Sequence, residues 1–186
     1  MTKVVLLGDS IRQIGYGTKV PALLGESYEV WQPTDNCRFA QYTLRMLFDK
    51  KKELEGADII HWNNGLWDAC DLFDDGPFTP IESYAATMLR IAGILQKLGK
   101  KVIFATTTPV DPANVHDHNE TISKYNAYLV PKLEAMGVLI DDLNSVVKPH
   151  IDTYIREDDH LHLSEAGIDA CAQAVVESIK KAEAML

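Results

Sequence analysis

Short apolar runs alternate with amphipathic segments along most of this chain. Residues 4–7 form a continuous apolar run that ends at Gly8, which is typical of a strand buried on both faces of a parallel sheet. The later apolar runs have a similar length, and residues that end a strand follow them as well. The sequence therefore predicts strands at 4–7, 28–31, 57–62, 101–106 and 138–140.

The segments between these runs have helical spacing. In residues 81–98, apolar side chains recur every three or four positions and Gly99 follows the last of them. This spacing places the apolar side chains on one face of a helix, and a glycine often ends one. Ser164 is a favourable first cap for a final helix. Helices are predicted at 38–54, 81–98 and 122–136, and from Ser164 through Ile179.

Strand and helix alternate about five times, which predicts a doubly wound α/β sheet with right-handed crossovers. The chain has 186 residues, the usual size of one domain, so residues 1–186 are expected to form a single domain. Ligands in such sheets bind outside the carboxyl ends of the strands. The loops that begin at Gly8, Pro33, Asn63 and Thr107 are therefore expected to converge.

The composition limits the kinds of molecule that the protein is expected to bind. Residues are 46% hydrophobic and 24% charged, as in ordinary globular proteins, and 18 basic against 27 acidic residues give a net charge of −9. This balance argues against binding to nucleic acid or to anionic membranes. The three cysteines form no CxxC pair, so neither a disulfide framework nor a thiolate zinc site is expected, and a reducing cytoplasm fits best. Assembly into a homo-oligomer is compatible with the sequence.

Two polar motifs could carry chemistry. The turn Gly8-Asp9-Ser10 follows the first strand directly and places a hydroxyl at the mouth of the sheet. Asp159 and His162 stand three residues apart just before the last helix. A serine nucleophile needs a base, and the base needs an acid to orient it. Taken separately, each motif could instead be a helix cap or a polar surface loop.

Together the two motifs resemble the first and last sequence blocks of the SGNH (GDSL-type) hydrolases, and the resemblance spans almost the whole chain. It implies a flavodoxin-like three-layer α/β/α sandwich with a central parallel sheet of about five strands. It also implies a serine esterase with Ser10 as nucleophile, His162 as general base and Asp159 as the acid that orients it. No cofactor and no metal are implied. The segments that carry the resemblance are 4–10, 106–110, 125–126, 137–141 and 159–167.

Two blocks depart from the commonest pattern of that family, and both concern the oxyanion hole. The family loop after the second strand supplies a backbone N–H, usually from glycine, and Cys37 stands in that place here. The resemblance implies the N–H groups of Ser10 and Cys37 as two of the donors. The third block is usually Gly-x-Asn-Asp, whereas Trp67 occupies the position of its asparagine here.

Residues 63–68, NNGLWD, resemble a branch of the family with an Asn-x-Gly-Leu-x-Asp block. An amide just before the glycine is therefore the expected third donor, Asn63 first and Asn64 second. Asp9 and Trp67 are expected to contact the substrate. The thiol of Cys37 is not expected to be a nucleophile, because nothing in the sequence lowers its pKa.

The segment His116-Asp117-His118 could be interpreted as a metal site, since imidazoles and carboxylates bind zinc and manganese. No third and fourth ligand stand at a characteristic spacing. A polar loop that borders the substrate pocket is the favoured interpretation.

The sequence therefore predicts an esterase that acts on small-molecule esters with acetyl or other short acyl groups, carbohydrate esters among them, through an acyl-enzyme on Ser10. Three alternatives remain. The same residues could transfer an acyl group to an alcohol, or the chain could be a carbohydrate- or ester-binding module without turnover. A flavodoxin-like nucleotide binder is the third, although the chain lacks both the P-loop lysine and the GxGxxG glycines.

Overall fold

The computed structural model describes residues 1–186 and is built around a five-stranded sheet in the order β2-β1-β3-β4-β5. Every neighbouring pair of strands is parallel. This architecture confirms the predicted flavodoxin-like α/β class. The strands are β1 (Thr2–Leu7), β2 (Tyr28–Trp31), β3 (Ala57–Trp62), β4 (Gly99–Ala105) and β5 (Leu139–Asp141).

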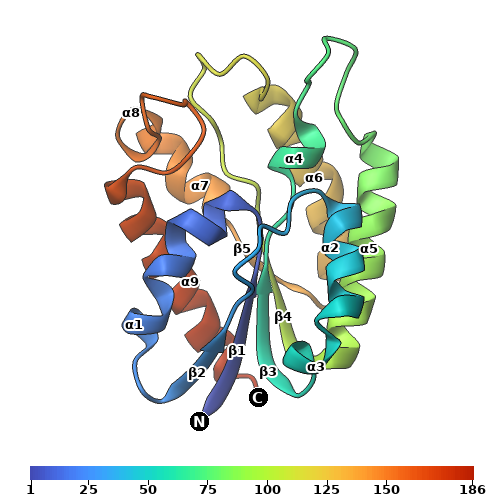
Figure 1. Ribbon diagram of the computed structural model, residues 1–186, viewed down its shortest axis with the longest axis vertical. Helices are drawn as coiled ribbons and strands as arrows, with labels where there is room; N and C mark the ends of the chain where they lie inside the picture. The colour runs from blue at the N-terminus through green and yellow to red at the C-terminus, as the bar shows by residue number, and fades with distance from the viewer.

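Helices cover both faces of this sheet and give three layers (Figure 1). One face carries α2 (Ala40–Asp49), α3 (Lys51–Leu54), α5 (Ile81–Leu98) and α6 (Asn119–Ala135). The other carries α1 (Val20–Leu24), α7 (Leu143–Val147), α8 (Ile151–Tyr154) and α9 (Glu165–Glu183). The remaining helices are short: η1 (Ile11–Gly15), η2 (Tyr16–Thr18), α4 (Leu66–Ala69) and η3 (Lys148–His150). None of the helices combines the length and hydrophobicity that crossing a membrane requires.

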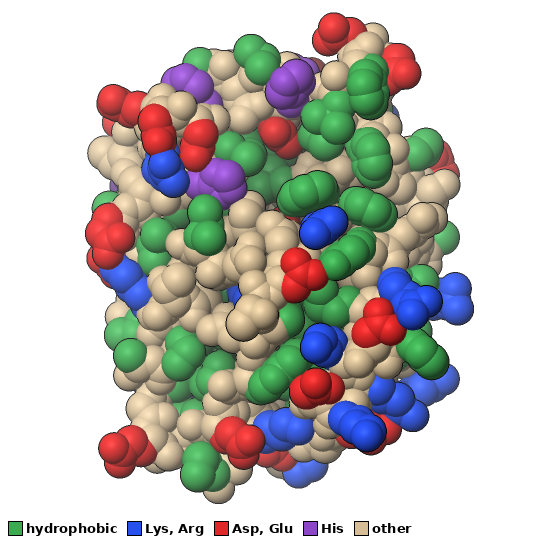
Figure 2. All heavy atoms as spheres, viewed as in Figure 1, with side chains coloured by type: hydrophobic (Ala, Val, Ile, Leu, Met, Phe, Trp, Pro, Cys, Tyr) green, Lys and Arg blue, Asp and Glu red, His purple; other side chains and the backbone are tan.

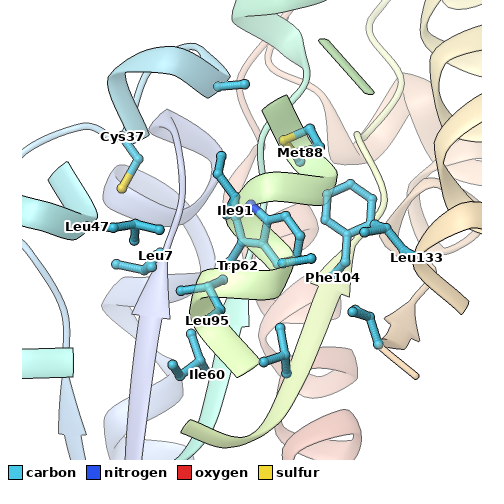
Figure 3. Close-up of a cluster of buried hydrophobic side chains, with 14 of the residues drawn as sticks. Leu7, Cys37, Leu47, Ile60, Trp62, Met88, Ile91, Leu95, Phe104 and Leu133 are labelled. Atoms are coloured by element: carbon cyan, nitrogen blue, oxygen red, sulfur yellow. The ribbon is translucent and has the colours of Figure 1, made fainter. Parts of the chain in front are cut away.

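Each face of the sheet has its own hydrophobic core. Val5 and Leu7 belong to the core under α2, α5 and α6, whereas Val4 and Leu6 belong to the core under α1 and α9. Successive side chains of a strand point to opposite faces, so a strand covered on both sides must be apolar throughout. In the first core, the rings of Trp62 and Phe104 lie 4.9 Å apart beside α5 (Figure 3).

The structure differs from the predicted elements mainly where elements are short. The predicted helix over 38–54 is divided at Lys50, whose φ of −110° and ψ of 20° leave the helical region. Four helices of four or five residues, α1, α4, α7 and α8, were not predicted. A helix of one turn is too short to show a hydrophobic period in the sequence.

Gly167 is buried in the first turn of α9, where the backbone approaches the preceding segment closely. A Cβ at this position would lie 2.2 Å from the carbonyl oxygen of Tyr154. The Ser164 hydroxyl accepts a hydrogen bond from the Gly167 N–H at 3.2 Å, which caps the helix. Gly93, within α5, meets no atom closer than 3.9 Å at its own Cβ position.

We therefore expect Gly167→Ala and Gly93→Ala to have opposite effects on stability. The first should lower the free energy of unfolding by about 2 kcal/mol, because the contact is with backbone that cannot rotate away. The second should raise it by about 0.5–1 kcal/mol through helix propensity. Urea denaturation of both variants checks this, and equal effects would show that the contact at Gly167 is not tight.

Candidate active site

The structure brings together the three residues proposed as a catalytic triad. Ser10 follows β1, while Asp159 and His162 lie in the loop before α9. The Nε2 atom of His162 lies 2.8 Å from the Oγ atom of Ser10, although 152 positions separate the two residues. On the other side of the ring, Nδ1 of His162 lies 2.9 Å from Oδ2 of Asp159. A hydrogen-bonded chain therefore runs from carboxylate to imidazole to hydroxyl.

Asp159 is held as an ionised carboxylate. Its Oδ1 atom accepts hydrogen bonds from the backbone N–H groups of Leu161 and His162 at 3.0 and 2.9 Å. Burial pushes the pKa of Asp159 upward, but these bonds and the His162 side chain outweigh burial and lower it to about 2. An ionised Asp159 requires a proton on Nδ1 of His162, which leaves Nε2 free to accept the proton of Ser10.

Asp9 fixes the turn that carries Ser10. Its Oδ1 atom accepts hydrogen bonds from the Ile11 N–H and from Nδ2 of Asn63, each at 3.0 Å. Burial raises the pKa of this carboxyl, which is 1% exposed. The prediction that Asp9 contacts the substrate is wrong, because the side chain points into the protein. The N–H of Ser10 has no acceptor within the protein.

Asn63 and Asn64 occupy different environments. Nδ2 of Asn63 uses one hydrogen on Asp9, and its Oδ1 atom accepts from the Tyr16 hydroxyl at 3.2 Å. Its second amide hydrogen makes no bond. Both amide hydrogens of Asn64 are engaged, by the Arg38 carbonyl at 2.8 Å and the Thr43 hydroxyl at 2.9 Å. Asn64 therefore has no hydrogen left for an oxyanion.

Cys37 forms two hydrogen bonds with Gly8, one through its backbone N–H and one through its thiol. Its backbone N–H donates to the Gly8 carbonyl at 3.1 Å, and its Sγ atom accepts from the Gly8 N–H at 3.2 Å. The prediction that the Cys37 N–H is an oxyanion donor is wrong, because this hydrogen is already used. The residue is fully buried, and burial raises the pKa of its thiol.

No family model matches the sequence, and no curated protein matches it either. Solved structures do match. A lipase/acylhydrolase from Enterococcus faecalis superposes with a TM-score of 0.77 at 23% identity, over 97% of this chain and 96% of that one. An acetylxylan esterase from Geobacillus stearothermophilus gives 0.77 at 17% identity, over 96% and 94%. An α/β hydrolase from the metagenome of Lake Arreo, Spain, gives 0.77 at 17%, over 96% and 95%.

The chain has the fold of the SGNH-type hydrolases. At these identities the likeness concerns the fold, and the Asn-x-Gly-Leu-x-Asp block is an observation on this sequence alone.

Within this fold, the loops after β2 and β3 meet at Asp68, the buried carboxylate that ends the NNGLWD block. Oδ2 of Asp68 accepts a hydrogen bond from the Ala40 N–H at 2.9 Å, and burial raises the pKa of Asp68 to about 6. Its neighbour Trp67 is 41% exposed, so an incoming ligand can reach the indole. No three His, Cys, Asp or Glu side chains form a group that could hold a metal.

Arg12 is a structural residue of the site that sequence reasoning missed. Its side chain is 1% exposed and donates to the carbonyls of Pro33 at 2.8 Å, Asp35 at 2.8 Å and Gly8 at 3.1 Å. A buried arginine that satisfies three carbonyls ties the turn of the nucleophile to the loop after β2. A single arginine two positions after a serine is no sequence signal for this role.

We expect Arg12→Met to lower the free energy of unfolding by about 3 kcal/mol, because the hydrogen bonds from the buried guanidinium to three carbonyls are lost. The matched control is Arg45→Met, which removes an exposed pair with Asp49 and should change stability by less than about 1 kcal/mol. Urea unfolding of both variants measures the difference. Similar small losses in both would contradict the structural role of Arg12.

Proposed function

We propose that the protein is a serine esterase that hydrolyses small-molecule esters with short acyl groups through an acyl-enzyme on Ser10. The observation that carries this proposal is the continuous chain from Asp159 through His162 to Ser10, with contacts of 2.9 and 2.8 Å. The whole chain is the catalytic unit in this proposal, because the nucleophile follows the first strand and the base precedes the last helix.

The proposed acylation and deacylation steps use only Ser10, His162, Asp159 and a water molecule. His162 Nε2 takes the Ser10 proton as Oγ attacks the ester carbonyl, and the imidazolium is stabilised by ionised Asp159. When the tetrahedral intermediate collapses, the bond to the alcohol oxygen breaks and His162 returns the proton to that oxygen. A water molecule then gives its proton to His162 and attacks the acyl carbon, which releases the acid and restores Ser10.

Two donors are available for the charge that develops on the carbonyl oxygen. They are the backbone N–H of Ser10, which has no protein acceptor, and the second amide hydrogen of Asn63. Asp9 and the Tyr16 hydroxyl hold the two ends of the Asn63 amide. An amide fixed in this way needs no reorganisation when charge develops, which is the condition for effective transition-state stabilisation.

The fold neighbours support an ester substrate, since they include a lipase/acylhydrolase and an acetylxylan esterase. We infer acetyl esters, with carbohydrate acetates among the candidates. The reacting groups are open to solvent rather than enclosed, with the side chains of His162 and Asp159 exposed by 23% and 32%, so a substrate with a bulky alcohol part can reach Ser10.

Ser10→Ala should lower kcat for p-nitrophenyl acetate by at least about 10³-fold, because the nucleophile is lost. The control Ser83→Ala removes an exposed hydroxyl from α5 and should leave the rate unchanged. Release of p-nitrophenol from both variants and the wild type is the measurement. Equal rates in Ser10→Ala and the wild type would refute the proposed nucleophile.

Asn63→Ala should lower kcat by about 10²-fold or more while KM changes little, because the lost donor acts on the transition state. Trp67→Phe removes the only N–H of the side chain at the family's usual asparagine position and should retain kcat within about fivefold. Steady-state kinetics with circular dichroism of each variant separate catalysis from folding. If Trp67→Phe lowered kcat more than Asn63→Ala does, the oxyanion donor would be Trp67 instead of Asn63.

A further inference from the structure

Asp117 is a mostly buried residue whose carboxylate makes no hydrogen bond within the protein, and the mechanism above does not use it. The residue is 9% exposed, and only its backbone N–H takes part in a hydrogen bond, with Asn114. Its oxygens are not among the fully buried polar atoms that lack a partner, so they remain accessible from outside the protein. An accessible carboxylate that no protein group bonds can accept a hydrogen bond from a bound ligand.

Hydrogen bonds between its two ends close the loop that carries Asp117. Asn119 donates to the Val110 carbonyl at 2.8 Å and accepts from the Val110 N–H at 2.9 Å. Within the loop, Oδ1 of Asn114 accepts from the N–H groups of His116 and Asp117 at 2.9 and 2.8 Å. The position of Asp117 is therefore set before any ligand binds.

This loop lies between the two segments that border the candidate active site. On one side, the Asp111 N–H donates at 3.1 Å to the carbonyl of His160, which stands between Asp159 and His162 in the chain. On the other side, the His116 carbonyl accepts at 2.7 Å from the N–H of Asp71, shortly after the helix of Trp67. Figure 2 shows histidine side chains gathered at the upper end of the molecule, with hydrophobic and acidic side chains among them.

The charges that act on Asp117 agree with this placement. Burial raises the pKa of Asp117 to about 6, while the neighbouring His116 and His118 oppose the rise. Asp9 raises this pKa further and His162 lowers it. A carboxyl with this pKa is mostly ionised at neutral pH and can accept hydrogen bonds.

We propose that Asp117 accepts a hydrogen bond from a free hydroxyl on the alcohol part of the ester, so that the site prefers esters of polyhydroxylated alcohols. This inference rests on the proposed function and deepens it. A hydroxyl fits better than a cation, because the exposed imidazoles of His116 and His118 flank the carboxylate and repel a cation when protonated. A hydroxyl can donate to Asp117 and still accept from solvent or an imidazole N–H.

The test compares glycerol monoacetate with n-propyl acetate, which has the same three-carbon skeleton without the free hydroxyls. Acetate release by the wild type should favour glycerol monoacetate in kcat/KM by about tenfold or more, the range of a hydrogen bond to a charged group. Asp117→Ala should abolish this preference through KM and leave n-propyl acetate unaffected. Asp75→Ala removes an exposed carboxylate from the neighbouring loop and should retain the preference.

Three results would overturn the inference. An equal loss for both esters in Asp117→Ala would show a structural role, and retained preference would show that Asp117 does not touch the alcohol. A preference for acetylcholine over both esters that disappears in Asp117→Ala would assign a cation instead of a hydroxyl.

Failure of the esterase itself is a separate outcome. If the wild type releases acetate from no ester, the proposed function fails, and the inference is then decided by binding alone. Glycerol monoacetate should bind Ser10→Ala, measured by NMR titration, at least about tenfold more tightly than the variant that combines Ser10→Ala with Asp117→Ala. Equal binding by the two would overturn the inference without reference to turnover.

Discussion

Three loops of the sheet meet at Gly8, and the geometry of the candidate active site depends on that contact. A Cβ at residue 8 would lie 1.7 Å from Oδ1 of Asn63, so no other residue fits without moving the loop after β3. The Gly8 carbonyl accepts from the Cys37 N–H and from Arg12, and its N–H donates to the Cys37 thiol. The backbone just before Ser10 is thus joined to the loops after β2 and β3.

This junction explains the composition of the proposed oxyanion hole. The close approach of the loop after β2 uses the Cys37 N–H for structure, so it cannot act on a substrate oxygen. The same approach brings Asn63 against Gly8 and Asp9, where its amide is oriented by bonds at both ends. In the proposed site, Asn63 before the glycine of the third block is the donor, and the asparagine that the commoner pattern places after that glycine is not needed. Preorganised donors of this kind supply much of the rate in ester hydrolysis.

The sequence predicted the architecture for physical reasons and the proposed triad through the resemblance of two motifs to a known family. Strands buried on both faces must be apolar throughout, which made the five runs visible, and Ser10, Asp159 and His162 stand directly beside the ends of strong elements. Asp9, Cys37 and Arg12 were misjudged or missed because their roles come from contacts between loops. Whether a backbone N–H is free depends on which carbonyl lies opposite, and no periodicity in the sequence records that. The sequence placed Asp117 on a loop near the pocket, but only the structure shows that the residue is mostly buried and that no protein group bonds its carboxylate.

The proposed mechanism requires that Ser10 becomes acylated during turnover. Mass spectrometry of protein quenched within the first turnovers with p-nitrophenyl acetate tests it most directly. We expect protein heavier by one acetyl group, with the modification on the peptide that contains Ser10 and absent from Ser10→Ala. Turnover without an adduct on that peptide, or an acetyl group on a different residue that persists in Ser10→Ala, would contradict it.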